Sequence, residues 1–448
     1  MDVAGYLHDG TWRTIRASHD GAPMTAQQYD LFAVTAHGLG ELCAAELARI
    51  GVEGRVETGG VTWRGSAESL YRANVELRTA SRVIARAGEF RARGFAELER
   101  RAGKLPLSEF LTPGTPVVLR VTCRKSKLYH EGAVAERVAR VLTDSAGVIV
   151  QGLAADTADD DDGAPADDGT SAGEGTSAGD GAPAGEGAPA GERAFAQLIV
   201  VRFMRDVCTI SVDTSGTLLH QRRYRQAIAR APLRETIAAA MLLASGWDAD
   251  SPLIDPMCGS GTVAIEGALL ARDIAPGIAA HDLSARAYAF EKWPHFDGDH
   301  FAKVVDSARS RVRPARVPII AVDRDAGAIT AARANAARAG VDSDIEFRRA
   351  RFEDLEPDAG SGHIVTNPPY GLRVGDRREL RGLYSAFGST VRARLPGWSV
   401  TMLAADDGLA AATGLPLQEY LATRNGGIPV RLLTTARTGA AHPEAASV

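Results

Sequence analysis

The stretch that decides the fold is Pro252-Leu-Ile-Asp255-Pro-Met-Cys-Gly259-Ser-Gly261-Thr262-Val-Ala264. Its first residues predict a short buried strand, and the residues from Thr262 onward predict a helix. Gly259, Gly261 and Ala264 match the pattern G-x-G-x-x-G/A, in which glycines permit a tight turn and a close approach of the backbone to a ligand. This strand, loop and helix therefore indicate a cofactor-binding loop in an α/β domain.

Helices and strands alternate from Arg234 to the end of the chain. The apolar spacing predicts helices at 234–245, 262–271, 326–339 and 380–395, and strands at 253–254, 317–322, 344–348, 363–366 and 399–404. This order predicts a doubly wound, mostly parallel sheet. The turn Asn425-Gly-Gly427 predicts a closing antiparallel hairpin between 420–423 and 428–434.

An acidic residue is expected at the end of the second strand, where it would hold the hydroxyl groups of a ribose. Asp323 occupies that place in Ile319-Ile-Ala-Val-Asp323, but it lies 68 residues after Asp255. Because such loops and acids are usually about 20 residues apart, residues 273–316 are expected to form an extra segment. The loop and the acid fit both NAD and S-adenosylmethionine.

The strand at 363–366 ends in Asn367-Pro368-Pro369-Tyr370-Gly371. Two prolines fix an extended backbone and remove two hydrogen-bond donors, so the Asn367 side chain and the Pro368 carbonyl can both accept from one planar NH₂ group. Tyr370 offers a ring on which a flipped base can stack. Holding both N–H bonds orients the nitrogen toward a methyl donor, so this motif favours S-adenosylmethionine over NAD. Cys258 lies inside the cofactor loop and is interpreted as a structural residue rather than a nucleophile.

The first half of the chain has a different, α+β pattern. Strands are predicted at 31–35, 61–63, 117–122, 197–201 and 208–212, and helices at 41–50, from Ser66 and at 132–142. Residues 1–28 show no periodicity and are expected to be a disordered tail. We expect residues 29–220 to form one region, followed by a second domain at 221–448.

Charge is unevenly distributed along the 448 residues, whose formal net charge is −5. Eleven of the 56 acids lie between Asp156 and Glu192, within a low-complexity segment that lacks large apolar residues. We expect 152–192 to be a disordered insert, because such a composition cannot offset the entropy of ordering. Outside this stretch the chain has 51 basic residues and 45 acids, and the resulting positive charge suits an RNA partner.

Several classes of protein are excluded by composition. No apolar run is long enough to span a membrane, and the N-terminus lacks the features of a secretory signal. The four cysteines lie far apart, which predicts neither a metal site nor a disulfide framework. We expect a cytoplasmic protein without a metal, whose oligomeric state the sequence leaves open.

The two motifs resemble those of the THUMP-containing class I RNA guanine-N2 methyltransferases, and most closely the 23S rRNA type represented by RlmL. The similarity extends to Leu31–Leu42, Val121–His130, His220–Arg225 and Ala231–Glu235. The resemblance implies a Rossmann-like class I methyltransferase domain with a seven-stranded doubly wound sheet, preceded by an α+β domain that contains an RNA-binding THUMP domain.

The resemblance also implies roles for particular residues. S-adenosylmethionine would contact Asp255, Pro256, Met257, Gly259, Gly261, Thr262, Asp323 and Asn367, and the target amine would contact Asn367, Pro368 and Tyr370. One position departs from the family: Arg351 stands where an acid usually contacts the adenine amino group. Glu353 or Asp354 could replace that acid through a local shift.

A basic stretch with interleaved aromatic side chains is the candidate for RNA contact. It comprises Arg124, Lys125, Lys127, Tyr129 and His130, and Arg225 is added from the segment between the domains. rRNA is the favoured substrate. The alternatives are a tRNA guanine-N2 methyltransferase of the same architecture, an adenine-N6 DNA methyltransferase, a glutamine methyltransferase of release factors, and a non-catalytic RNA-binding protein.

Overall fold

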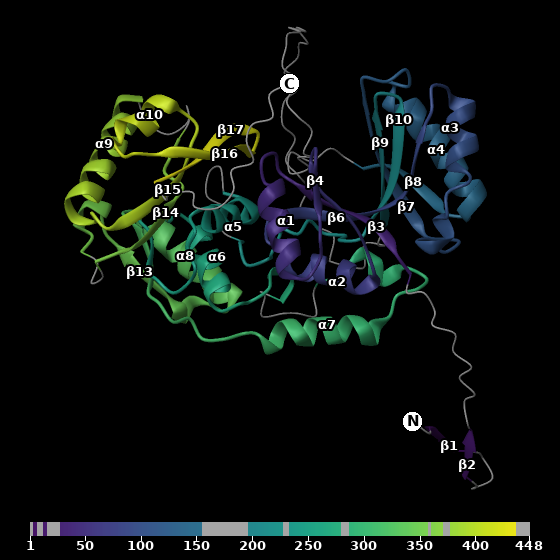
Figure 1. The fold of residues 1–448 in the computed structure, drawn as a ribbon, viewed down its shortest axis with the longest axis horizontal. Coiled ribbons are helices and arrows are strands. Elements are labelled where there is room, and N and C mark those ends of the chain that lie inside the picture. Colours follow the sequence, from purple (N-terminus) through teal and green to yellow (C-terminus); the bar gives the residue numbers. More distant parts are fainter. Residues whose placement is uncertain are drawn as a thin grey trace.

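The computed structural model describes residues 27–154, 196–226, 233–278, 286–356, 360–370 and 377–435, and the backbone of β1 (Val3–Tyr6) and β2 (Trp12–Ile15). Two bodies built on separate sheets stand next to each other (Figure 1). β1 and β2 pair as a short antiparallel ladder within the stretch expected to be a disordered tail. The predicted acidic insert lies outside the described residues, apart from 152–154 at its start.

The N-terminal body contains an eight-stranded mixed sheet. Its strands follow the order β4 (Arg55–Glu57), β5 (Gly60–Gly65), β3 (Tyr29–Thr35), β6 (Ala80–Arg91), β10 (Val207–Asp213), β9 (Gln197–Met204), β7 (Pro116–Arg124) and β8 (Ile149–Leu153). β9 and β10, which include the strands predicted at 197–201 and 208–212, form a hairpin across Arg205 and Asp206. The strands on either side of the insert, β8 and β9, both pair in parallel with β7, so the sheet continues across it.

One face of this sheet carries the hydrophobic core. The inward residues of each strand alternate with polar residues on the other face, as in β5, where Val61 and Trp63 are buried and Arg64 is exposed. The core is covered by α1 (Gly40–Arg49), α2 (Ala67–Glu76), α3 (Phe95–Ala102) and α4 (Glu131–Ala146). The opposite face of the sheet, called here the open face, carries most of its arginine side chains.

The long strand β6 was not predicted, although it lies at the centre of the sheet. The apolar Ile84 lies between Arg82 and Arg86 on the outward face, so the strand lacks an obvious alternation of apolar and polar residues. A bulge near Gly88 shifts the register with β10 and interrupts the period further. The side chain of Leu105 packs against Gly88, where a Cβ would lie 2.4 Å from the Cδ2 of Leu105.

The C-terminal body has the predicted alternation of helices and strands. Its seven-stranded sheet follows the order β13 (Ile345–Arg349), β12 (Ile319–Asp323), β11 (Leu253–Asp255), β14 (Gly362–Thr366), β15 (Trp398–Ala404), β17 (Ile428–Thr434) and β16 (Gln418–Asn425). Parallel pairing joins the first five strands, and β17 runs antiparallel to both of its neighbours. The predicted closing hairpin is therefore present.

Helices cover both faces of this sheet, as a doubly wound fold requires (Figure 1). One face packs on α5 (Glu235–Ala244), α6 (Thr262–Ala271) and α8 (Ala326–Ala339). The other face packs on α9 (Arg377–Arg394) and the short α10 (Asp407–Ala412). Within the described part of the chain, no helix has the length and apolar character that crossing a membrane would need.

The extra segment predicted at 273–316 packs mainly against the N-terminal body. It contains α7 (Gly298–Ser310) and the short helix η4 (Ala289–Lys292). Phe290 packs on Tyr71 of α2 with a centroid distance of 4.9 Å, and Trp293 packs on Phe110 at the same distance. The extra segment follows the cofactor loop in sequence, but its aromatic side chains belong to the core of the N-terminal body.

A buried polar network also joins the two bodies. Arg222, in the connecting segment, forms an ion pair with Glu266 of α6, and both side chains are fully buried. The Tyr224 hydroxyl donates to the other carboxylate oxygen of Glu266 over 2.8 Å. Arg222 also donates to the carbonyl oxygen of Arg78, between α2 and β6, over 2.6 Å.

We expect Arg222→Ala to lower the free energy of unfolding by about 3–5 kcal/mol, because Glu266 would keep a buried charge without its partner. Urea unfolding followed by circular dichroism measures this loss. The control is Arg140→Ala, which removes a mostly exposed pair with Glu136 on α4 and is expected to cost less than about 1 kcal/mol. Equal stability of the two variants would contradict the expectation.

Candidate functional site

The glycine loop lies at the carboxyl end of the central strand β11. From β11 the chain leads to its neighbour β12 on one side, and after β13 it returns to β14 on the other side. Ligands bind at this switch point in doubly wound sheets. The amide of Cys258 donates to the carbonyl of Val322 over 2.9 Å and holds the loop against β12. Burial raises the pKa of the Cys258 thiol, which fits a structural residue rather than a nucleophile.

Two loop glycines have left-handed backbones for different reasons. Gly261, the residue before α6, has φ +85°, and an added Cβ would lie 2.9 Å from the Cβ of Ala332 on α8. Gly259 has φ +53°, and an added Cβ would meet no atom within 4 Å. Gly261 therefore permits close packing of α6 on α8, while Gly259 faces open space that can receive a ligand.

Asp323 is placed beside this loop, as the sequence predicts. Its carboxylate accepts hydrogen bonds from the amide of Gly259 over 3.0 Å and from the amide of Asp325 over 2.9 Å. Asp325 in turn caps the N-terminus of α8. The acid at the end of the second strand and the glycine loop thus form one unit, although 64 residues separate Gly259 from Asp323.

Asp255 is a buried carboxyl at the end of β11. The hydroxyl of Thr366 donates to it over 3.0 Å, and the amide of Met257 lies 3.4 Å from the same oxygen. Burial raises the pKa of Asp255 to about 7, with Asp323 adding to the increase, whereas the hydrogen bonds act in the opposite direction. Thr366 joins Asp255 to the strand that carries Asn367, and sequence reasoning did not identify it.

The Asn-Pro-Pro-Tyr motif follows β14 directly. The side-chain oxygen of Asn367 is buried and has no hydrogen-bond partner among the described residues. Tyr370 accepts a hydrogen bond at its hydroxyl from Asn425 over 2.9 Å, and the hydroxyl of Tyr384 lies 3.4 Å from the carbonyl oxygen of Pro369. Asn425 and Tyr384 therefore hold the motif in place, and neither was predicted. Gly371 lies outside the described residues.

The remaining predicted cofactor contacts are buried near the loop. Pro256 and Thr262 are buried, and the partly buried Met257 packs against the core beneath α9 and α10. Arg351 is exposed, and its guanidinium lies 3.5 Å from a carboxylate oxygen of Glu353, one of the two acids that could replace it beside the cofactor adenine. Asn335, at a buried position of the Ala-rich helix α8, donates to the carbonyl of Ser260 over 3.0 Å and is a loop contact that the sequence analysis missed.

The predicted RNA contacts lie on the other sheet. Arg124, Lys125 and Lys127 are exposed after β7, and Tyr129 has an exposed fraction of 77%. His130 is exposed too, and its Nδ1 accepts from the amide of Ala133, so it also caps α4. The guanidinium of Arg225, by contrast, donates to the carbonyl of Leu233 and to Glu235, both in the C-terminal body.

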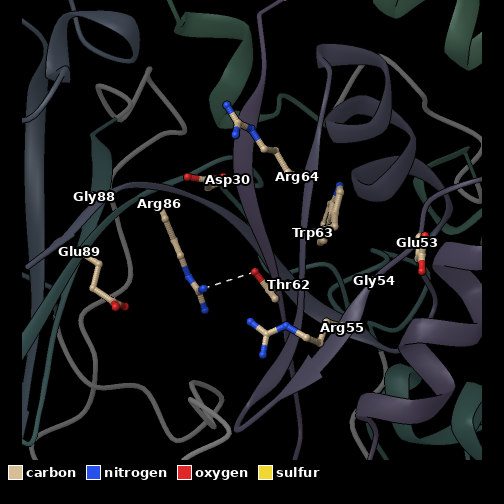
Figure 2. A pocket seen from close by; sticks show the side chains of 10 residues that line it. All are labelled: Asp30, Glu53, Gly54, Arg55, Thr62, Trp63, Arg64, Arg86, Gly88 and Glu89. Atoms are coloured by element: carbon tan, nitrogen blue, oxygen red, sulfur yellow. Dashed lines mark hydrogen bonds between the residues drawn. The ribbon is translucent and has the colours of Figure 1, made fainter.

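A separate hollow of about 720 Å³ lies on the open face of the N-terminal sheet (Figure 2). Arg86 reaches across it toward Thr62 and also donates to Glu57 over 2.9 Å. The arginines around the hollow are accompanied by acids such as Asp30 and Glu89, and no cysteine or histidine is present in its lining. Its residues do not suggest a catalytic centre.

Comparison with known families identifies both bodies. Residues 222–432 match the family described as "RMKL-like, methyltransferase domain", and residues 30–84 match the "RlmL ferredoxin-like domain". The chain carries an RMKL-like methyltransferase domain. The predicted methyltransferase domain and fold class are thereby confirmed, and the glycine loop and the Asn-Pro-Pro-Tyr motif both fall within this domain.

Similar proteins support this assignment over most of the chain. A Synechocystis sp. protein named as a candidate RNA methyltransferase is 28% identical, over 92% of this chain and 98% of its own length. The ribosomal RNA large subunit methyltransferase K/L of Syntrophotalea carbinolica is 34% identical over 90% of this chain, which spans only 53% of that relative. A crystal structure of a candidate methyltransferase complexed with S-adenosylhomocysteine (SAH) is 26% identical, with a TM-score of 0.74, and covers 92% of this chain and 98% of that one.

S-adenosylmethionine is the cofactor of this methyltransferase domain. The residues at the switch point fit it, because Gly259 borders open space, Asp323 ends the second strand and Asn367 carries an unpartnered buried oxygen. We infer that Asp255 and the glycine loop hold the methionine part, and that Asp323 holds the ribose. The bound cofactor supplies an electrophilic methyl group on a sulfonium centre.

We expect the affinity for SAH to rise as the pH rises through about 7, the pKa of Asp255. The methionine part carries a cationic amino group, which favours an ionised Asp255, so below that pH binding releases a proton and weakens by up to about tenfold per pH unit. Calorimetry across this range measures the slope. In Asp255→Asn the same slope should vanish, and a wild-type affinity independent of pH would contradict this role of Asp255.

Proposed function

We propose that this protein transfers a methyl group from S-adenosylmethionine to the exocyclic N2 of a guanosine in large-subunit rRNA. The observation that carries the proposal is the buried, unpartnered side-chain oxygen of Asn367 at the end of β14. A buried acceptor without a partner is costly unless a ligand satisfies it. A planar NH₂ group is the donor that fits this acceptor and the neighbouring Pro368 carbonyl.

The motif supplies positioning rather than a covalent intermediate. An exocyclic amine is a weak nucleophile because its lone pair is delocalised into the ring. When the Asn367 oxygen and the Pro368 carbonyl accept its two N–H bonds, the lone pair is directed at the methyl carbon. Bound S-adenosylmethionine would supply the methyl group: the N–C bond would form as the S–C bond breaks, with that electron pair left on sulfur and the surplus amine proton released to solvent.

Tyr370 holds the base in this proposal. Its ring offers a stacking surface, and its hydroxyl is fixed by Asn425 of β16 over 2.9 Å. Because Asn425 belongs to the closing hairpin, the base platform is supported from a part of the fold distant in sequence from the motif. Asn367, Pro368 and Tyr370 are thus the proposed contacts of the target base.

The choice of RNA as substrate comes from the relatives and from the N-terminal body. The Synechocystis relative is named for RNA, and the Syntrophotalea relative for large-subunit rRNA. The exposed basic residues Arg124, Lys125 and Lys127, with Tyr129 nearby, suit contacts with phosphates and unpaired bases. We infer that this stretch binds the substrate RNA.

We expect the purified protein and labelled S-adenosylmethionine to convert guanosine to N2-methylguanosine in protein-free large-subunit rRNA. Nucleoside mass spectrometry identifies both the modified base and the RNA that carries it. Label found only in tRNA would favour a tRNA guanine-N2 methyltransferase. N6-methyladenosine as the product would contradict the proposed base.

We expect Asn367→Ala to reduce methyl transfer by at least about 10²-fold, while the affinity for SAH stays close to that of the wild type. The reason is that the variant loses the acceptor for the target amine and keeps the glycine loop. Asn367→Asp keeps an oxygen acceptor at the same place and should retain more activity. Loss of SAH binding in both variants would mean that Asn367 is mainly structural.

A further inference from the structure

Three separate segments bring basic side chains to one end of the N-terminal sheet. They are the end of β6, the residues after β7, and the turn between β9 and β10, which meet because β6, β10, β9 and β7 are consecutive neighbours in the sheet. We call this surface the basic rim, and it consists of Arg91, Arg93, Arg124, Lys125, Lys127 and Arg205. All six side chains belong to exposed residues.

Asp206 ties the three segments together. Its carboxylate accepts from the amide of Lys127 over 2.8 Å and from the Arg93 guanidinium over 3.2 Å. Its carbonyl accepts from the amide of Ala92 over 2.9 Å, and its own amide donates to the hydroxyl of Ser126 over 3.0 Å. One residue thus contacts both neighbouring segments through its side chain and its backbone.

The rim is held in a conformation that its residue types rarely adopt. Lys125, Arg205 and Asp206 have φ values of 49°, 51° and 66°, in the left-handed region. Glycine or asparagine would adopt these backbone conformations with less strain. The Asp206 hydrogen bonds offset this local strain, and the hydrogen bond of the Lys127 amide, together with Arg93, lowers the pKa of Asp206.

The acids near the rim are already engaged by backbone amides. Glu97 accepts from the amide of Arg93 over 3.2 Å, and Glu131 accepts from the amide of Cys123 over 3.0 Å. Six cations therefore stand against three nearby acids, Asp206, Glu97 and Glu131, which leaves the rim net positive, whereas three arginines and three acids line the hollow of Figure 2. Tyr129, with an exposed fraction of 77%, supplies an aromatic ring in the segment that carries Lys125 and Lys127.

A second hollow, of about 670 Å³, opens on the same sheet next to the rim. It is lined by Arg202, Met204 and Val207, which lie on the two strands joined at Arg205. The rest of its lining includes Arg55 and Arg86 together with the acids Glu57 and Glu89. Its lining is mostly polar, so it does not present an apolar face for a protein partner. Exposed cations beside a polar hollow and a free aromatic ring are typical of surfaces that bind RNA.

We propose that the basic rim is a single RNA-binding surface and that Asp206 is its positioning residue. The proposal rests on the proposed RNA methyltransferase function. It extends the RNA contacts beyond residues 124–130 to Arg91, Arg93 and Arg205, which lie far from that stretch in sequence. RNA phosphates bind the six cations, and an unpaired base stacks on Tyr129.

The charge-reversal variant Arg91→Glu/Arg205→Glu tests the surface. The control is Arg100→Glu/Arg140→Glu, which makes the same charge change at exposed residues of α3 and α4, on the covered face of the sheet. The full-length proteins are titrated into a fluorescent single-stranded RNA of about 20 nucleotides, a length that allows several phosphate contacts, at several salt concentrations. Affinity for SAH serves as the check on folding.

We expect the rim variant to bind this RNA at least about tenfold more weakly at low salt. The slope of log affinity against log salt concentration should be smaller by the amount expected for about two fewer phosphate contacts. In methylation of rRNA, KM for the RNA should rise while kcat at saturating RNA stays near the wild-type value. The control should behave as the wild type in both assays. Equal binding by the rim variant and the control would overturn the proposal and favour a protein partner at this surface.

Asp206→Ala separates positioning from simple charge. Removing an acid from a surface that binds a polyanion would by charge alone strengthen RNA binding. If Asp206 holds the three segments together, affinity instead falls by several-fold, and SAH binding is unchanged. Stronger RNA binding by Asp206→Ala would overturn its positioning role.

The two proposals fail in different ways. A wild-type protein that binds RNA through the rim but methylates no guanosine would refute the proposed function and support the surface. A wild-type protein that methylates rRNA, with rim variants that bind and react as the control does, would refute the surface alone.

Discussion

The ion pair between Arg222 and Glu266 is the interaction on which the relation of the two bodies depends. Glu266 lies on α6, the helix that begins at the glycine loop, and Arg222 reaches from it to the carbonyl of Arg78 in the N-terminal body. Arg78 in turn donates to the carbonyl of Ile274 over 2.7 Å. A buried charge requires an opposite charge nearby, because an unpaired charge in a low-dielectric interior is very costly, and Glu266 supplies it for Arg222. The cofactor loop is therefore connected to the N-terminal body through fully buried groups.

A second contact between the bodies lies close to the target-base motif. Ala36, Leu39 and Leu42 pack with Ala240 of α5 and against Leu421 of β16. At Gly38 an added Cβ would lie 2.3 Å from the carbonyl oxygen of Ala422, so the backbones approach closely there. The same strand β16 ends at Asn425, which holds the hydroxyl of Tyr370. The body proposed to bind RNA is thus packed against the strand that holds Tyr370.

Local pattern predicted much of the methyltransferase domain. The glycine loop, Asp323 and Asn-Pro-Pro-Tyr each follow a buried strand, and parallel strands of one sheet carry their carboxyl ends to one edge. The neighbours that complete the site were not predictable in this way. Thr366, Asn425 and Tyr384 have ordinary local contexts, and their roles arise only from contacts across the sheet. The same reason explains the missed strand β6, whose outward arginines and bulge hide its alternation until Asp213 and β10 lie beside it.

The sequence by itself determined the class of fold, the cofactor loop and the motif for a planar amine, because these depend on short-range spacing and on the conformational limits of glycine and proline. It also indicated a basic stretch at residues 124–130. Only the tertiary structure decided that Arg225 is bound inside the C-terminal body, that 286–310 packs on the N-terminal core, and that Arg91, Arg93 and Arg205 join the basic stretch around Asp206. Charge and burial are properties of neighbours in space, and the neighbours of these residues come from distant parts of the chain.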